Sequence, residues 1–191
     1  MMRPLPLLLA ALVLPLAAAP ASAQFQPGLR APQNIGDGVF QSFLMGCYFA
    51  VSGRPANGLN VTLDRDGATL RPPTAIPDTL QGLIDTLDAS VRVVVLDTPG
   101  GPVWTFFDPA SRRCLIVPEP ADAEGIEAEL LRIVEADRDW RPVDREGGGR
   151  AFEQDFEANR SIRADAGRMR TWYQAAQGPA LPQMIVVERV R

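Results

Sequence analysis

The sequence predicts an α+β fold: a mostly antiparallel sheet of about five to seven short strands, two or three helices and one disulfide bond. Three observations lead to this prediction. Segments with helical spacing of apolar residues separate groups of short β-branched runs, the connections are short and rich in Asp, Gly and Pro, and the chain has only two cysteines. Groups of strands separated by helices are typical of α+β folds.

The first 23 residues have the pattern of a cleavable signal peptide. Arg3 supplies a positive charge, an apolar run covers residues 5–19, and an Ala-Ser-Ala triplet precedes Gln24. Small residues at these positions fit a signal peptidase, and the apolar run is shorter than the about 20 residues of a membrane-spanning helix. We therefore expect cleavage after Ala23, no stable membrane insertion, and a periplasmic or secreted protein. The alternative is an uncleaved N-terminal anchor.

The composition indicates a bacterial protein and narrows its partners. All 19 basic residues are arginine, and 23 acidic residues give the chain a net charge of −4. Phosphate backbones and anionic membranes attract basic surfaces, so nucleic acid and anionic lipid are not expected as partners. An arginine-only chain with this leader is typical of GC-rich bacteria.

The missing residue types exclude many reactions. Without histidine there is no Ser-His-Asp triad and no imidazole zinc site. Without lysine there is no P-loop, Schiff base or Ser-Lys dyad, and two cysteines are too few for common zinc or iron–sulfur sites. We expect no metal and no cofactor, and the sequence leans away from an enzyme.

Residues 24–36 are predicted to form a mobile lead, and residues 37–191 a single domain. The first helix is expected to begin at Asp37 and to end at Gly53. Its apolar residues recur every three or four positions: Val39, Phe40, Phe43, Leu44, Cys47, Tyr48 and Val51.

The next elements are a hairpin and a short helix. Residues 60–70 read as two strands around an Asp-Arg-Asp-Gly turn. A calcium loop is the rejected alternative, because Ala75 stands where its last acidic ligand would be. Asp78 is expected to cap the short helix, which carries Leu80, Leu83, Ile84 and Leu87.

Three strands and a longer helix follow. The apolar run 91–96 predicts a strand buried on both faces, and 103–107 with 113–117 predicts a hairpin that turns at Asp108 and Pro109. Residues 121–137 have helical spacing, with acidic residues early in the segment. Residues 139–149 read as a polar linker that ends in three glycines.

The last third is predicted to be a meander of strands. Apolar and acidic residues alternate from Phe152, and a second run at 168–173 and a third at 184–190 follow. The expected register pairs Glu157 with Arg168 and Asp155 with Arg170, because opposite charges across a strand pair are favourable.

Cys47 and Cys114 are expected to form a structural disulfide, because an exported chain meets an oxidising compartment. The bond would close a loop of about 67 residues, for which chain entropy gives roughly 4 kcal/mol. The alternative, a redox-active pair, usually has the spacing Cys-x-x-Cys, which is absent here.

An arginine group offers a candidate anion-binding site. Arg160, Arg163, Arg168 and Arg170 precede Trp172 and Tyr173, and guanidinium groups bind carboxylates and phosphates well. The favoured alternative is that these arginines pair with the three acids of the preceding strand: Glu153, Asp155 and Glu157.

A group of acids provides a second candidate site. Asp137, Asp139, Asp144 and Glu146 surround Trp140, and glycosidases use two carboxyl groups beside a surface that stacks on sugars. The favoured alternative is a solvated helix end and loop, where acids are ordinary.

These observations predict an exported, non-enzymatic binding or accessory protein of the cell envelope, whose partner is an envelope protein or a small anionic ligand. The alternatives are a carboxylate-dependent hydrolase of envelope polysaccharide and a small anion-binding domain that uses the arginine group.

Overall fold

The computed structural model describes residues 31–53, 70–71, 75–119, 123–145, 148–158, 166–178 and 181–190. The leader, most of the hairpin predicted at 60–70, Glu146, Arg160 and Arg163 lie outside the described residues. No helix within the described ranges is long and apolar enough to cross a membrane.

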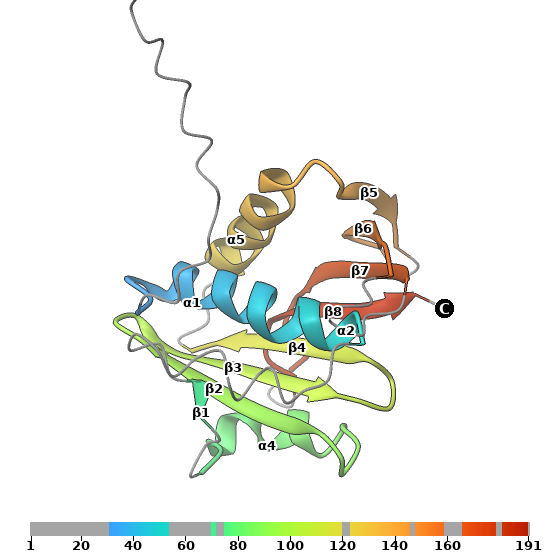
Figure 1. Ribbon diagram of the computed structural model, residues 1–191. Coiled ribbons are helices and arrows are strands. Elements are labelled where there is room, and N and C mark those ends of the chain that lie inside the picture. The colour runs from blue at the N-terminus through green and yellow to red at the C-terminus, as the bar shows by residue number, and fades with distance from the viewer. Residues whose placement is uncertain are drawn as a thin grey trace, which may run out of the picture.

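In the described part of the chain, one antiparallel sheet of eight strands forms the centre of the fold, with the order β1-β2-β3-β4-β8-β7-β6-β5 (Figure 1). Antiparallel pairing of β4 with β8 joins two meanders, β1 to β4 and β5 to β8, into this sheet. A mostly antiparallel sheet packed with helices confirms the predicted α+β fold. The strands are β1 (Leu70–Arg71), β2 (Arg92–Thr98), β3 (Gly101–Asp108), β4 (Arg113–Pro118), β5 (Arg141–Asp144), β6 (Arg150–Phe156), β7 (Gly167–Gln174) and β8 (Met184–Val190).

Helices cover both faces of the sheet. Three helical segments follow one another directly: α1 (Ile35–Gln41), the π-helix η1 (Ser42–Tyr48) and α2 (Phe49–Val51). Together with α5 (Ala123–Ala136), they pack on one face. The short helix α4 (Asp78–Ile84) packs on the opposite face (Figure 1).

The first helix begins earlier than predicted. Asn34 is its N-cap: the Asn34 side chain accepts a hydrogen bond of 2.8 Å from the backbone N–H of Asp37. The Asp37 carboxylate in turn accepts one of 3.0 Å from the backbone N–H of Gln33, so the two side chains satisfy exposed N–H groups reciprocally. The helical run ends at Val51 with Ser52 as its C-cap, and Gly53, the predicted stop, follows with a positive φ of 87°.

The middle of this helical run is wound as a π-helix, which apolar spacing did not predict. Gly46 lies there, and a Cβ on it would come within 3.3 Å of the Thr105 methyl group on β3. The close approach also brings Cys47 onto the sheet, where its side chain is fully buried. Such π-helical segments are rare and occur mostly within α-helices, as η1 does between α1 and α2.

The core has two layers because strand residues alternate between the faces. The first layer lies under α1, η1 and α5 and includes Val103, Phe107, Cys114, Ile116, Ile185 and Val187. The second layer includes Leu80 and Leu83 of α4 with Val95, Trp104, Phe106, Leu115, Val117 and Val186.

The predicted hairpin is confirmed as β3 and β4. The Asp108 carboxylate organises its turn, accepting bonds of 2.9 Å from the backbone N–H of Ala110 and 2.6 Å from the Ser111 hydroxyl. The predicted helix at 121–137 is α5, whose apolar side chains at Ile126 and Leu130 are buried.

Two local predictions were wrong. The segment 139–149 is not only a linker, because it contains β5, an edge strand with exposed side chains at three of four positions. An exposed edge strand shows no apolar alternation, and it tolerates Pro142 because one side of the strand lacks a partner. In α4 the N-cap is Pro77, and Asp78 lies in the first turn.

Candidate functional site

A row of charged residues crosses the sheet on the α4 side, from β3 to β5. The row begins with Asp108 on β3, whose cross-strand partner is Arg113 on β4. Every further residue of the row is the cross-strand partner of the residue before it. The sign of the charge alternates at every step, which favours the ladder because neighbouring strands then present opposite charges. This charged row consists of Asp108, Arg113, Glu188, Arg170, Glu153 and Arg141.

An apolar row runs beside the charged row, two residues further along each strand. It consists of Phe106, Leu115, Val186, Trp172, Ala151 and Val143, which belong to the second core layer or pack against it. The Arg145 guanidinium lies 4.7 Å from the Trp172 ring centroid. The charged row therefore marks the boundary at which the second core layer gives way to solvent.

Ion pairs link β5, β6 and β7 at this boundary. Arg170 contacts Glu153 at 2.6 Å, and Arg168 contacts the same carboxylate at 3.5 Å. Asp155 lies between Arg168 at 2.7 Å and Arg141 at 2.5 Å. The two acids differ in exposure: the Glu153 side chain is 10 % exposed, whereas that of Asp155 is 54 % exposed.

The ion pairs shift protonation equilibria in the direction expected for opposite charges. The hydrogen bond from Arg168, together with that from Arg141, holds the pKa of Asp155 below its ordinary value. The Asp155 carboxylate raises the pKa of Arg168. Near neutral pH Asp155 and Arg168 are therefore both charged.

The register predicted for β6 and β7 was wrong by two residues. Asp155 faces Arg168 and Glu153 faces Arg170, where the prediction had paired Glu157 with Arg168. Both registers put acids opposite arginines, so charge alone does not choose between them. Packing of Gly167 opposite Phe156 is specific to the observed register, because a Cβ on Gly167 would come within 3.0 Å of the Phe156 ring.

Of the predicted arginine group, Arg168 and Arg170 lie together and contact the acids of β6. Arg160 and Arg163 lie outside the described residues. Sequence analysis missed Arg141, which contacts Asp155 from the other side. The sequence feature that could have indicated a strand at Arg141 is the segment Arg-Pro-Val-Asp at 141–144, because charged residues and proline are typical of edge strands.

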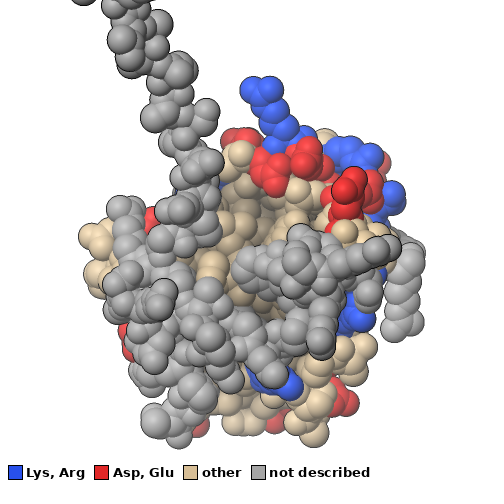
Figure 2. Space-filling model, in the orientation of Figure 1, with Lys and Arg blue, Asp and Glu red and all other residues tan. Residues whose placement is uncertain are grey.

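The predicted carboxylate group does not frame a sugar-stacking surface in the described part of the chain. Trp140 is buried, and its ring meets that of Phe43 edge-on with centroids 5.8 Å apart. Asp137 accepts a hydrogen bond of 2.8 Å from the Gln154 side chain. Asp144 is exposed on β5, where its cross-strand partner is Arg150. Acidic and basic side chains gather at the upper right of Figure 2, over the region where β5 and β6 lie in Figure 1.

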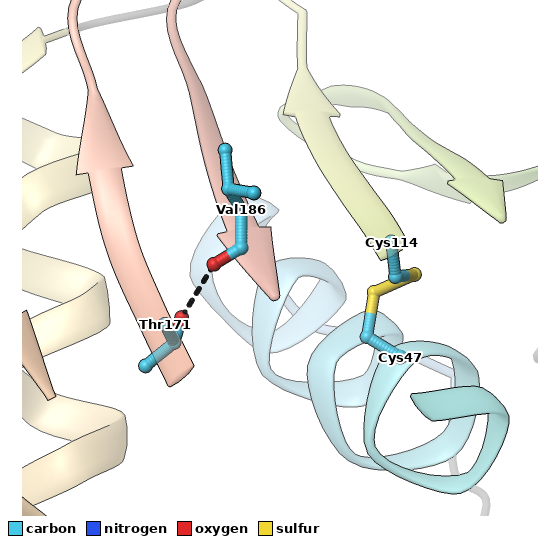
Figure 3. The surroundings of a disulfide bond; sticks show 4 residues. All are labelled: Cys47, Cys114, Thr171 and Val186. Atoms are coloured by element: carbon cyan, nitrogen blue, oxygen red, sulfur yellow. Dashed lines mark hydrogen bonds between the residues drawn. A yellow bond between two sulfur atoms is a disulfide. The ribbon is translucent and has the colours of Figure 1, made fainter. Parts of the chain in front are cut away.

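The disulfide between Cys47 and Cys114 is formed, as predicted, and joins η1 to β4 (Figure 3). Its S–S distance is 2.06 Å, its Cα atoms lie 5.3 Å apart, and both side chains are fully buried. The nearby Thr171 is buried too, and its hydroxyl donates a bond of 2.9 Å to the Val186 carbonyl (Figure 3). Burial shields both sulfurs from thiols in solution, so this geometry suits a structural bond.

A small pocket lies between α1 and α5. Its volume is about 120 Å³ and its lining is mostly apolar, with Ile35, Val39 and Ile126 beside Pro118. The one carboxylate in its lining, Glu129, already pairs with Arg132. Pockets that hold cofactors or drug-sized ligands are usually several times larger. Among the described residues, no group of three or more potential metal ligands comes together.

In comparisons with known proteins, no family model, curated protein or solved structure matches this chain.

Proposed function

We propose that this chain is an exported protein of the bacterial cell envelope that acts by binding another envelope component. The observation that carries the export part is the disulfide between Cys47 and Cys114. Disulfides of this buried, structural kind persist in the periplasm and outside the cell, and reducing systems in the cytoplasm disfavour them. The leader pattern of residues 1–23 supports the same compartment.

Two exposed arginines, Arg141 at the end of the charged row and Arg168 beside it, support a binding role. Arg141 and Arg168 are 59 % and 47 % exposed. They lie on β5 and β7, the two strands that flank β6 in the sheet. Guanidinium groups in fixed positions recognise carboxylates and phosphates with geometric specificity. This surface suits an anionic group on an envelope protein or on a small ligand.

Export is tested by expressing the full chain with its leader in a bacterium and measuring the intact mass of the protein in each cell fraction. We expect a periplasmic or secreted form that begins at Gln24 and lacks two thiol hydrogens. The matched control replaces Ala23 with Arg, which should block cleavage. A protein that begins at Met1 and stays in the cytoplasm with free thiols would overturn the export proposal.

Binding is tested by cross-linking capture from envelope extract, with wild-type protein beside the double variant R141Q/R168Q. We expect at least one component that only the wild-type protein captures and that high salt releases, because exposed charges are screened. Equal recovery by both proteins would contradict a role for this surface.

A polysaccharide hydrolase would need a second carboxyl group about 5–10 Å from Asp139 or Glu146 inside a cleft. In the described ranges, Asp137 and Asp139 lie exposed after the end of α5, and Trp140 is buried against Phe43. No observation favours this alternative over binding.

A further inference from the structure

We propose that Arg141 and Arg168 form a two-armed site for a phosphoryl group, and that Asp155 occupies this site when no ligand is bound. The proposal deepens the binding role given above, on which it rests, and it is independent of the proposal on export.

The two arginines converge on one point from opposite sides. Arg141 lies on β5 and Arg168 on β7, and these strands flank β6, which carries Asp155. Nη2 of Arg141 donates to one carboxylate oxygen of Asp155 at 2.5 Å, and Nε of Arg168 donates to the other at 2.7 Å. Each guanidinium therefore holds a separate oxygen of the same anion, as two arginines do around a phosphoryl group.

Exposure determines which carboxylate a ligand can replace. Asp155 is 54 % exposed and its short side chain can rotate into solvent, whereas Glu153 is 10 % exposed and stays against Arg170 at 2.6 Å. Glu153 also contacts Nη1 of Arg168 at 3.5 Å, so it positions that arginine while leaving its Nε for the exposed anion. Displacement of Asp155 therefore disturbs no buried ion pair.

The balance of charge favours a dianion. Among the described residues, three guanidinium groups, those of Arg141, Arg168 and Arg170, form ion pairs with two carboxylates in this cluster. When Asp155 rotates away, Glu153 is the carboxylate of the described residues that still forms ion pairs with Arg168 and Arg170. A phosphoryl dianion supplies more oxygens and more charge than the carboxylate that it replaces, and arginine binds such groups through paired hydrogen bonds.

The test uses D155N, which keeps the shape of the side chain but removes the competing charge. The matched control is E157Q, which removes an exposed acid from the same end of β6. Inorganic phosphate is titrated into the full chain at low salt and binding is followed by calorimetry. We expect D155N to bind at least about tenfold more tightly than either the wild type or E157Q, and D155N with R141Q and R168Q to lose this binding.

A second measurement does not depend on the stability of D155N. In the wild-type protein, phosphate should shift the NMR signal of the Arg168 side-chain Nε–H, and the R141Q variant should lose this shift. Vesicles that contain phosphatidic acid form a parallel arm. Binding of inorganic phosphate supports a soluble phosphoryl ligand, and binding of the vesicles alone supports a lipid headgroup.

The proposal is overturned if D155N binds phosphate and vesicles no better than E157Q and the Arg168 signal does not move. If envelope capture still depended on Arg141 and Arg168 in that case, the binding role would stand and only the phosphoryl ligand would be wrong.

Discussion

Gly167 of β7 lies directly opposite Phe156 of β6, and a Cβ on Gly167 would come within 3.0 Å of the Phe156 ring and 2.8 Å of the Arg189 guanidinium. The Arg189 guanidinium itself lies 5.4 Å from the centroid of the same ring. Three groups therefore meet at a position where only glycine leaves enough space. This contact accompanies the register that places Asp155 between Arg141 and Arg168.

We predict that G167A destabilises the protein by about 1–3 kcal/mol, because a methyl group here overpacks the contact between Phe156 and Arg189. Urea denaturation followed by tryptophan fluorescence measures the change. The same G167A substitution is also made in an F156L background, where the smaller side chain leaves space for the new methyl group. We expect G167A to cost less stability there than in the wild type. Equal losses in the two backgrounds would show that this contact does not set the cost.

We predict that the double variant C47A/C114A, or reduction under denaturing conditions, lowers the free energy of unfolding by up to about 4 kcal/mol. The bond spans 67 residues and restricts the unfolded chain. Thermal unfolding with and without reductant measures the effect, and the double variant should not respond to reductant. A wild-type protein equally stable in both conditions would contradict a structural role for the bond.

Regular periodicity explains why most of the fold could be predicted from the sequence. The strands β3 and β4 carry nearly continuous apolar runs because both of their faces are buried. The helix α5 repeats its apolar residues at helical spacing because one face packs on the core. The strand β5 was not predicted, because an edge strand with exposed side chains has no such pattern of apolar residues. The π-helix was not predicted either. It accompanies the close approach of Gly46 to Thr105, which is a tertiary contact that apolar spacing does not reveal.

The candidate site could be predicted only in part. The acids of β6 and the arginines of β7 were recognised as partners, because alternating charge signals a strand pair. Which acid met which arginine depended on Phe156 and Gly167, so a register shifted by two residues satisfied the charges equally well. Arg141 comes from a strand that was read as a linker, and the convergence on Asp155 therefore required the structure.

We predict that the contribution of Asp155 to stability is lost in acid. Hydrogen bonds from Arg168 and then Arg141 hold the pKa of Asp155 below its ordinary value of 3.8. A lowered pKa in the folded state means that the stabilisation is complete above pH 3.8 and is lost as the pH falls through the folded-state pKa. Wild type should therefore be more stable than D155N at pH 7, and the difference should shrink below about pH 4.

Carbon-detected NMR titration of the Asp155 carboxyl group tests whether the contact with Arg168 is the cause of its lowered pKa. Its pKa should rise in R168Q, which removes the largest contribution to the shift. An unchanged pKa in R168Q would show that this ion pair does not form in solution.

The last prediction concerns Trp140, which is buried in the first core layer and packs edge-on against Phe43 with ring centroids 5.8 Å apart. Loss of a buried aromatic side chain leaves a cavity, so W140A should destabilise the protein by about 3–5 kcal/mol. W140F keeps an aromatic ring in the same space and should cost much less. Chemical denaturation of both variants measures these changes, followed by circular dichroism because W140A removes a fluorescent probe. If Trp140 instead served to stack on a sugar, W140A would leave stability nearly unchanged and would abolish binding to envelope polysaccharide. A stable W140A protein with lost polysaccharide binding would therefore support the hydrolase alternative over the binding role proposed for Arg141 and Arg168.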